Sequence, residues 1–272
     1  MKKLLFILVI LALCAVLAAG GALALARVQN ARLDVTEYAL SPDGLPAAFD
    51  GFTIAQISDY HGDAACRAQL LDALRARTPG LIAITGDLTD PGRVEESLSL
   101  ARELAGIAPT YYVTGNHETR LEEDFPRLLS GLQDAGVTVL RDESILLERG
   151  DARITVSGMD DPEFRTGVDL AALCDPDGFT LLLAHRPELF TEYVRAGADL
   201  VLAGHAHGGQ FRIPGSCQGV YAPTEGFFPQ YTQGVHTEGR TTMVVSRGLA
   251  NLYFPPRLFN APELVLVTLH GE

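Results

Sequence analysis

Leu81-Ile82-Ala83-Ile84-Thr85-Gly86-Asp87-Leu88-Thr89-Asp90 is the stretch on which the prediction of the fold rests. The apolar run over 81–85 predicts a short buried strand. A glycine and then Asp87 follow it directly, and α/β sheets bind their ligands at the carboxyl ends of their strands. The stretch therefore predicts an α/β fold with a polar site at one edge of the sheet.

Four further segments end an apolar run in the same way, with Asp, Asn or His. These segments are Ile57-Ser58-Asp59-Tyr60-His61, Val113-Thr114-Gly115-Asn116-His117-Glu118, Leu183-Ala184-His185 and Ala203-Gly204-His205-Ala206-His207. Five of the seven histidines of the chain lie in them. A single histidine is most often an ordinary core or surface residue, and Gly-Asn-His is compatible with a simple turn. The shared placement of all the segments instead indicates a metal or catalytic site.

We interpret these segments as a two-metal hydrolytic centre that Asp87 bridges. Asp59 and His61 are separated by one residue, and alternate residues of an extended segment point the same way. His205 and His207 repeat this spacing. Imidazole and carboxylate ligands together suit Mn, Fe, Zn or Ni better than calcium. Mg is a further candidate ion. A bridged pair of ions lies roughly 3.5–4 Å apart, and a water between them loses a proton near neutral pH and becomes a nucleophile.

The order of the predicted elements favours a largely parallel sheet. Strands and helices alternate over the first half, as in α/β folds with covered sheet faces. The predicted helices lie at 65–77, 93–105, 121–135 and 188–196. The predicted strands lie at 32–39, 52–58, 81–85, 110–114, 137–140, 145–148, 154–158, 179–184, 200–203, 242–246 and 263–270. The strands at 137–140, 145–148 and 154–158 are predicted to form a meander. Residues 208–239 are predicted to be a long loop with little regular structure, of the kind that often forms a pocket wall.

Length and charge narrow the class of protein. A chain of 272 residues that is 47% hydrophobic can bury a full core as one large domain. Its net charge is -13, and -15 outside the first 26 residues, which carry only Lys2 and Lys3. Because nucleic-acid binding depends on neutralising phosphates, this charge disfavours a non-specific nuclease. A small phosphorylated substrate stays open, since bound metal ions invert the local field.

An apolar segment begins the chain. Leu4 to Ala26 are 23 residues without a charge, enough to cross a bilayer core of roughly 30 Å. The alternative is a cleaved signal peptide, since Ala22-Leu23-Ala24 and Ala24-Leu25-Ala26 resemble cleavage sites. We expect an anchor over 1–27, a lead-in over 28–50 and a catalytic domain over 51–272. Lys2 and Lys3 favour an extracytoplasmic domain, whereas Arg27 and Arg32 on the other flank oppose that orientation.

Taken together, five motifs resemble the signature of the calcineurin-like metallophosphoesterases. They are Asp59-x-His61, Gly86-Asp87-x-x-Asp90, Gly115-Asn116-His117-Glu118, His185 and Gly204-His205-x-His207. The resemblance implies a four-layer α/β/β/α sandwich with a dinuclear centre. By position, Asp59, His61, Asp87 and His207 would hold the first metal, and Asp87, Asn116, His185 and His205 the second. His117 would contact the phosphoryl group and protonate the leaving oxygen, with Asp90 holding its ring.

Flanking segments resemble the membrane-anchored bacterial branch of that family. They are the segment at 49–58 that precedes Asp59, the segment Gly204–Gln210, and the tail at 257–263. The branch implies a phosphate monoester or diester substrate, with phospholipid or lipid-precursor phosphoesters among the candidates. Tyr60 replaces a leucine that is common between the first two ligands, and it either faces the pocket or packs in the core.

Other functions and residues stay open from the sequence. The rival activities are a protein Ser/Thr phosphatase, a nuclease, and a non-catalytic, metal-stabilised binding module tethered to the membrane. Glu118 and Arg186 adjoin site residues but are not assigned a role. Asp160, Asp161 and Arg247 either contact substrate or are solvated surface charges, and the second is predicted because charged residues are mostly exposed.

Overall fold

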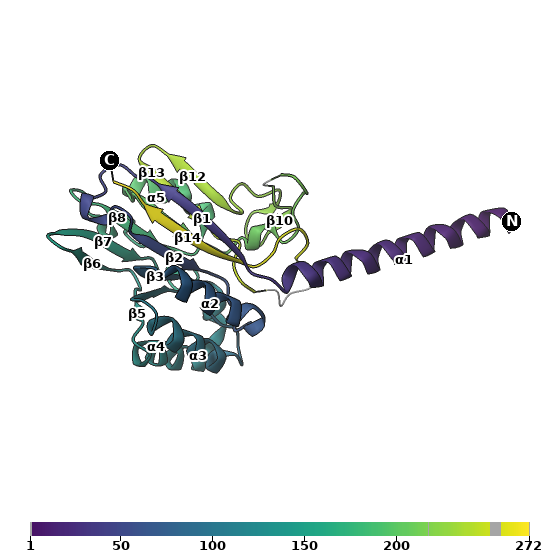
Figure 1. Ribbon diagram of the computed structural model, residues 1–272, viewed down its shortest axis with the longest axis horizontal. Coiled ribbons are helices and arrows are strands. Elements are labelled where there is room, and N and C mark those ends of the chain that lie inside the picture. The colour runs from purple at the N-terminus through teal and green to yellow at the C-terminus, as the bar shows by residue number, and fades with distance from the viewer. Residues whose placement is uncertain (1, 217, 251–256, 272) are drawn as a thin grey trace.

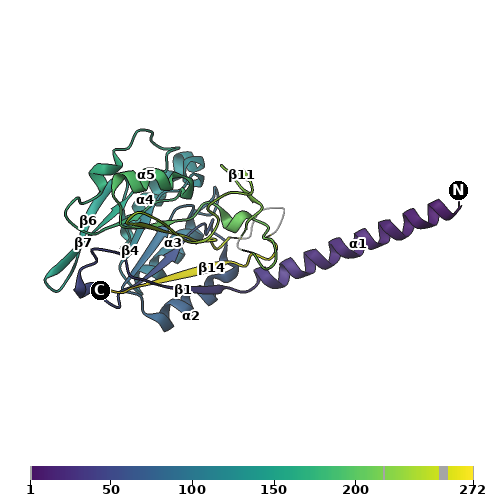
Figure 2. The same cartoon turned by 90° about the horizontal axis from the view of Figure 1, so that it is seen from above.

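Two six-stranded sheets lie face to face, with helices on both outer faces and one long helix that extends away from the domain (Figures 1 and 2). The computed structural model describes residues 2–216, 218–250 and 257–271. The predicted four-layer α/β/β/α sandwich is confirmed.

The first sheet has the order β1-β14-β2-β3-β4-β5. Its strands are β1 (Asp34–Leu40), β14 (Glu263–Leu269), β2 (Thr53–Ile57), β3 (Leu81–Thr85), β4 (Thr110–Val113) and β5 (Thr138–Val139). Every neighbouring pair is parallel except β14 and β2. The sheet is therefore largely parallel, as predicted, and the chain's last long strand lies inside it.

The second sheet has the order β12-β13-β9-β8-β7-β6. Its strands are β12 (Gly234–Glu238), β13 (Thr241–Val245), β9 (Leu200–Ala203), β8 (Thr180–Leu183), β7 (Ala152–Gly158) and β6 (Glu143–Arg149). The two outer pairs are antiparallel hairpins and the inner pairs are parallel. A small separate hairpin pairs β10 (Tyr221–Ala222) with β11 (Gly226–Phe227).

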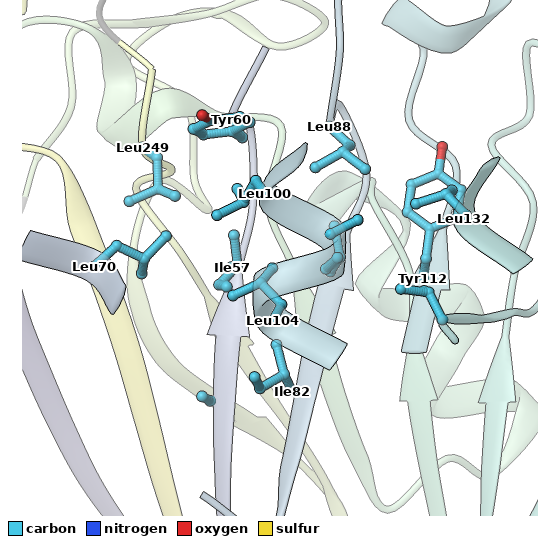
Figure 3. Packing of buried hydrophobic residues seen from close by; sticks show 14 of the residues in the cluster. Ile57, Tyr60, Leu70, Ile82, Leu88, Leu100, Leu104, Tyr112, Leu132 and Leu249 are labelled. Carbon is cyan, nitrogen blue, oxygen red and sulfur yellow. The ribbon is translucent and has the colours of Figure 1, made fainter. Parts of the chain in front are cut away.

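Helices cover the outer face of each sheet. The first sheet is covered by α2 (Arg67–Arg77), α3 (Val94–Ala105) and α4 (Phe125–Asp134), and the second by α5 (Phe190–Ala196). In Figure 3, Leu70, Leu100 and Leu104 pack over Ile57 and Ile82. Tyr60 is buried in the same cluster and its hydroxyl donates to Glu96 Oε1 at 2.9 Å. Tyr60 therefore packs in the core.

Strand alternation builds the layer between the sheets. Leu81 and Ala83 of β3 face the second sheet, while Ile82 and Ile84 face the helices. Leu200 and Leu202 of β9 likewise face the first sheet. Because successive side chains of a strand point to opposite faces, these fully apolar strands can be buried on both sides.

Three predicted elements differ from the structure. The strand predicted at 137–140 pairs with β4 in the first sheet, so the predicted meander is wrong there and only β6 and β7 form a hairpin. The helix predicted over 121–135 begins at Phe125, because Glu122 has φ 48° and Pro126 suits only a first helical turn. The predicted loop over 208–239 contains β10, β11 and β12. β12 has one large apolar side chain, Val235, which is exposed, and the hairpin strands are short, so hydrophobic alternation did not reveal them.

The N-terminal segment is a single helix, α1 (Lys2–Asn30). Among the described residues it is the one helix long and apolar enough to cross a membrane, and its apolar side chains are exposed. Only its last turn touches the domain, where Ala26 and Asn30 are buried. A signal sequence would satisfy the same criteria of length and composition.

The inter-sheet layer generates a stability prediction. Leu202→Ala should lower the free energy of unfolding by about 2–5 kcal/mol, because the buried side chain leaves a cavity. Leu146→Ala removes the same atoms from an exposed position of β6 and should change the free energy of unfolding by less than about 0.5 kcal/mol. Urea unfolding of the detergent-solubilised chain, followed by circular dichroism, measures both. Equal losses for the two variants would contradict this description of the core.

Candidate metal centre

All the predicted site residues follow strand ends at one edge of the sandwich. Asp59 and His61 follow β2, Asp87 follows β3, and Asn116 and His117 follow β4. The second sheet contributes His185 after β8 and His205 and His207 after β9. Because these strands are parallel within each sheet, their carboxyl ends meet at one edge.

Left-handed backbone turns bring the side chains together. Five of the seven predicted metal ligands have positive φ, namely Asp59 (52°), His61 (50°), Asp87 (50°), His205 (65°) and His207 (47°). The expectation that Asp59 and His61 share an extended segment is therefore wrong, since β2 ends at Ile57. Such conformations are costly for residues with a side chain, and they cluster at functional sites where the surroundings impose them.

One group of donor atoms lies on the side of the first sheet. Asp59, His61, Asp87 and His207 each offer an atom within 4.8 Å of the others. His61 Nε2 lies 3.7 Å from Asp87 Oδ2, and His207 Nε2 lies 3.6 Å from Asp59 Oδ1. These separations leave room for a cation between the donors.

A second group shares Asp87 and extends toward the second sheet. Asp87, His185 and His205 offer donor atoms within the same 4.8 Å limit. His185 Nε2 lies 3.3 Å from Asp87 Oδ2 and 3.2 Å from His205 Nδ1. The side-chain oxygen of Asn116 is buried and has no hydrogen-bond partner among the described residues. A buried amide oxygen without a donor is costly, and a cation at this group would satisfy it.

Two of the four imidazoles among the predicted ligands, those of His205 and His207, have the protonation state that metal ligation requires. Burial, then the charges of His185 and Arg186, lower the pKa of His205 to about 2. Burial and the charge of Arg257 hold the pKa of His207 well below its usual range. Both rings are therefore neutral, the form in which histidine binds metals.

His185 and Asp87 form the charged pair of the cluster. Burial opposes the charge on His185, but Asp87 and Asp59 outweigh it and raise the pKa of His185 to about 10. Burial alone would raise the pKa of Asp87, yet the charges of His185, His61 and His117 hold it well below its usual range. A divalent ion beside Asp87 and His185 would take the place of the proton that charges His185, since metal ions and protons compete for the same ligands.

Asp90 contacts two histidines at once. Its Oδ1 lies 2.6 Å from His117 Nδ1 and 3.2 Å from His61 Nδ1. The other ring nitrogen of His117 points toward the cluster, 3.9 Å from Asp87 Oδ2. A carboxylate on Nδ1 fixes the tautomer and orientation of an imidazole, so Asp90 orients both rings.

Glu118, to which the sequence pattern assigns no role, is fully buried behind the cluster. Its two oxygens accept hydrogen bonds from the backbone N–H groups of Gly115 (2.7 Å), Asp87 (3.1 Å) and Thr89 (3.2 Å). Burial and the charge of Asp87 raise the pKa of Glu118 to about 8, while the bonds from Gly115 and Thr89 oppose that rise. Glu118 ties two ligand-bearing loops together, and its place directly after His117 was the available sequence signal.

The predicted surface charges at Asp160, Asp161 and Arg247 are wrong, because all three residues are buried. Asp161 accepts two hydrogen bonds from Arg186, at 2.7 and 3.0 Å. Arg186 Nη1 in turn lies 3.2 Å from His205 Nε2. The ion pair therefore lies against the cluster. Charge type alone did not reveal this burial, since the partners are far apart in sequence.

Glycines allow the loops to approach closely. A Cβ on Gly115 would lie 2.2 Å from Asp87 Oδ1, and one on Gly204 would lie 1.8 Å from Ser58 Oγ. Neither position can carry a side chain without moving a ligand-bearing loop.

A cavity of about 590 Å³ opens over the cluster. On one side it is lined by Asp87, Asn116, His117, His205 and His207, with Arg120 beside them. The other side is apolar and is lined by Phe211, Val220, Tyr221, Pro223 and Phe227. The cavity thus joins a charged floor to an apolar wall.

The two-sheet α/β sandwich and this cluster of carboxylates and imidazoles define a metal-dependent hydrolytic enzyme with a candidate dinuclear site. The sequence pattern of the calcineurin-like phosphoesterases matches residues 52–209. The chain belongs to that family, and it is a metal-dependent phosphoesterase. The predictions of the family and of an enzyme are thereby confirmed.

Several known proteins are similar over most of their length. The uncharacterized metallophosphoesterase YkuE of Bacillus subtilis is 29% identical over 93% of this chain and 91% of its own. The phosphodiesterase YaeI of Escherichia coli is 30% identical over 70% of each chain. Among solved structures, TT1561 of Thermus thermophilus matches with a TM-score of 0.49 and 14% identity, over 74% of this chain and 91% of its own.

Glu118 generates a prediction for the metal centre. Glu118→Gln should lower the free energy of unfolding by about 1–3 kcal/mol, because an amide cannot accept all three backbone hydrogen bonds. The ligand-bearing loops should then move apart and bind less metal. Glu123→Gln makes the same change at an exposed position nearby and should alter neither quantity. Metal per chain and urea unfolding measure the effects, and an unchanged metal content in Glu118→Gln would refute the role of Glu118.

Proposed function

We propose that this chain is a membrane-anchored phosphoesterase with its catalytic domain outside the cytoplasm. Residues 1–27 would form the anchor, 28–50 a lead-in and 51–272 the catalytic domain. The exposed apolar surface of α1 supports an anchor, and the branch to which we assign the chain is the membrane-anchored bacterial one. Release of the domain after cleavage of a signal peptide is the alternative arrangement.

The ligand sets that we propose follow the two donor groups. Asp59, His61, Asp87 and His207 would hold one divalent ion, and Asp87, Asn116, His185 and His205 the other. The shared Asp87, the neutral His205 and His207, and the buried oxygen of Asn116 support this assignment. Two ions there (Mn, Fe, Zn, Mg or Ni) would supply Lewis-acid activation of water and neutralise charge on the phosphoryl oxygens.

The role of His117 rests on its contact with Asp90. The 2.6 Å bond to Nδ1 leaves Nε2 to face the cluster and the cavity. We propose that this Nε2–H contacts the phosphoryl group and passes its proton to the leaving oxygen, while Asp90 stabilises the charged ring. The proposal of hydrolysis rests on this one arrangement. A non-ligand imidazole, that of His117, is held beside Asp87, the carboxylate that the two donor groups share.

The substrate that we propose is a phosphate ester, and a diester in particular. The name of the relative YaeI as a phosphodiesterase supports diester chemistry. The apolar wall of the cavity supports an ester with a phospholipid or lipid-precursor part. A net charge of -13 disfavours nucleic acids, and no feature of the cavity favours a protein phosphatase.

Replacing His117 tests the acid. His117→Asn should lower kcat by about 10²–10⁴, the usual contribution of a general acid, with two metals per chain retained. His270→Asn is the matched control, because His270 follows β14 at the opposite edge of the first sheet. Steady-state hydrolysis and metal analysis of the detergent-solubilised chain measure the effects. Equal kcat values for His117→Asn and the wild type would remove His117 from the mechanism.

Metal removal tests the dinuclear assignment. The chain stripped with a chelator should lose hydrolysis of bis-p-nitrophenyl phosphate and of p-nitrophenyl phosphate. Adding Mn, Zn, Fe, Mg or Ni should restore it as the metal content approaches two per chain, because Asp87 belongs to both donor groups. Full activity at one metal per chain would argue against the second ligand set, and the ratio of the two esters would report diester against monoester preference.

A further inference from the structure

The catalytic edge of the sandwich lies at the same end of the domain as α1. β1 begins at Asp34, four residues after α1 ends, and pairs in parallel with β14 from Glu263. β2 runs antiparallel to β14, so the carboxyl end of β2 lies beside the start of β14. The register therefore brings Asp59 and the rest of the donor cluster to the end of the domain from which α1 leaves. Figure 1 shows β1 and β14 side by side, with α1 extending from that end.

Two residues connect α1 to the cluster. The side chain of Asn30, the last residue of α1, donates to the backbone oxygen of Arg257 at 3.0 Å. The guanidinium of Arg257 lies 3.2 Å from Nδ1 of His207. Both Asn30 and Arg257 are buried. The apolar run of α1 ends at Ala26, so the surface of a bilayer that α1 crosses would lie close to the metal centre.

Exposed apolar side chains gather at the same end. We define the hairpin face as Ile213, Tyr221, Phe227, Phe228 and Phe259. Phe227 is 74% exposed, Phe228 64% and Phe259 41%. In Figures 1 and 2 the segment of β10 and β11 lies at the end of the domain nearest α1. Large exposed apolar patches on a domain mark surfaces that contact protein or membrane.

Two of these phenylalanines have an unfavourable backbone conformation. Phe228 has φ 57° and Phe259 has φ 55°. A bulky residue with positive φ is a genuine outlier, and glycine or asparagine would hold the same turn at less cost. The fold therefore holds these aromatic rings outward, where packing within the domain stabilises them little.

Backbone hydrogen bonds connect α1 to the hairpin in short steps. Phe259 N–H donates to the side chain of Gln29 in the last turn of α1, at 2.9 Å. Leu258, next to Phe259, pairs with residues 211–212. These pair in turn with residues 219–220, and Val220 accepts a backbone hydrogen bond from Phe228. Three such steps of about 5 Å place the hairpin roughly 15 Å from the residue that contacts α1.

The hairpin also forms the apolar wall of the catalytic cavity. Val220, Tyr221, Pro223 and Phe227 line the cavity opposite the donor cluster. Tyr221 and Phe227 contact each other edge to face, with ring centroids 5.6 Å apart. The β10–β11 hairpin thus lines the cavity and also contributes to the exposed hairpin face.

We propose that the hairpin face lies in the interfacial layer of the bilayer that α1 crosses, with Phe227, Phe228 and Phe259 among the lipids, so that the cavity receives a phosphoester directly from the membrane. The proposal rests on the proposed function, because it requires α1 to be an anchor. The ligand class is a membrane lipid whose phosphoryl group reaches the metal centre while its apolar part contacts the wall at Phe211, Val220 and Phe227.

The surroundings of the face favour a bilayer over a protein partner. α1 holds the domain at the membrane, so lipid is within reach at all times. Arg32 and Arg212 line the hollow that they share with Ile213, Phe259 and Asp34, and Arg27 is exposed on the last turns of α1. Basic residues at this level attract anionic lipid headgroups, and tyrosine is typical of the membrane–water interface.

The chain contains no tryptophan, so single tryptophans report on the face directly. Phe227→Trp and Phe228→Trp are made in the full chain and reconstituted in vesicles of phosphatidylcholine and phosphatidylglycerol. Leu146→Trp, at an exposed position of β6, is the matched control. Fluorescence is measured with a quencher attached to the lipid acyl chains and, separately, with acrylamide in the water.

The two hairpin tryptophans should be quenched by the lipid-bound quencher at least twofold more than the control and should be protected from acrylamide. Acrylamide quenching equal to that of Leu146→Trp would overturn the proposal. Protection from acrylamide without lipid quenching would also overturn it, because a protein or a second copy would then cover the face.

A kinetic readout separates this proposal from the proposed function. Phosphatidyl-p-nitrophenol in vesicles is compared with soluble bis-p-nitrophenyl phosphate. Phe228→Asn suits the positive φ and should lower the ratio of kcat/KM for the lipid ester to that for the soluble ester by about tenfold, since one aromatic anchor is lost. Leu146→Asn should leave the ratio unchanged. An unchanged ratio in Phe228→Asn overturns the docking proposal alone, whereas absence of metal-dependent hydrolysis of both esters by the wild type overturns the proposed function.

Discussion

The carboxylate of Asp87 is fully buried, and the site is arranged to compensate it. A buried charge without partners is prohibitively costly. Asp87 Oδ2 lies within 3.9 Å of nitrogens of His61, His117 and His185, which come from three different strand ends. Asp87 Oδ1 accepts the backbone N–H of His117 at 2.8 Å. Both sheets converge on the two oxygens of this carboxylate, and the loops that carry the ligands include left-handed turns. Gly115 has no space for a side chain because Asp87 lies against it.

Much of the fold follows from local patterns, and the remainder depends on long-range pairing. The short apolar strands at 81–85 and 200–203 have the bounds that were predicted, because burial on both faces leaves a continuous apolar run. The sequence places β5 in the wrong sheet and does not reveal β12, since an edge strand of two residues, or one with a single large apolar residue, leaves no periodicity. The motif spacing indicated which residues meet at the site. It placed Glu118 beside His117 but could not indicate that Glu118 is buried, nor that Arg186 pairs with Asp161, because both depend on partners from distant segments.

The site combines strain with tight polar contacts, and the surrounding core stabilises both. Five left-handed residues, a buried ion pair and a buried Glu118 all lie within the same edge. Each feature would destabilise an isolated loop. The fully apolar strands of both sheets lie directly behind them and supply the compensating burial. Stability and chemistry are thus separated along the strands, with apolar residues in the body and polar residues at the ends.

The position of β14 has a consequence for biosynthesis. This strand is the last of the chain and lies between β1 and β2, which are made near its beginning. The first sheet therefore cannot close until residues 263–269 have left the ribosome. Loop closure across more than 200 residues is slow, so a nascent chain remains open during its synthesis. The strand that joins β1 to β2 in the first sheet is thus among the last parts of the domain to be synthesised.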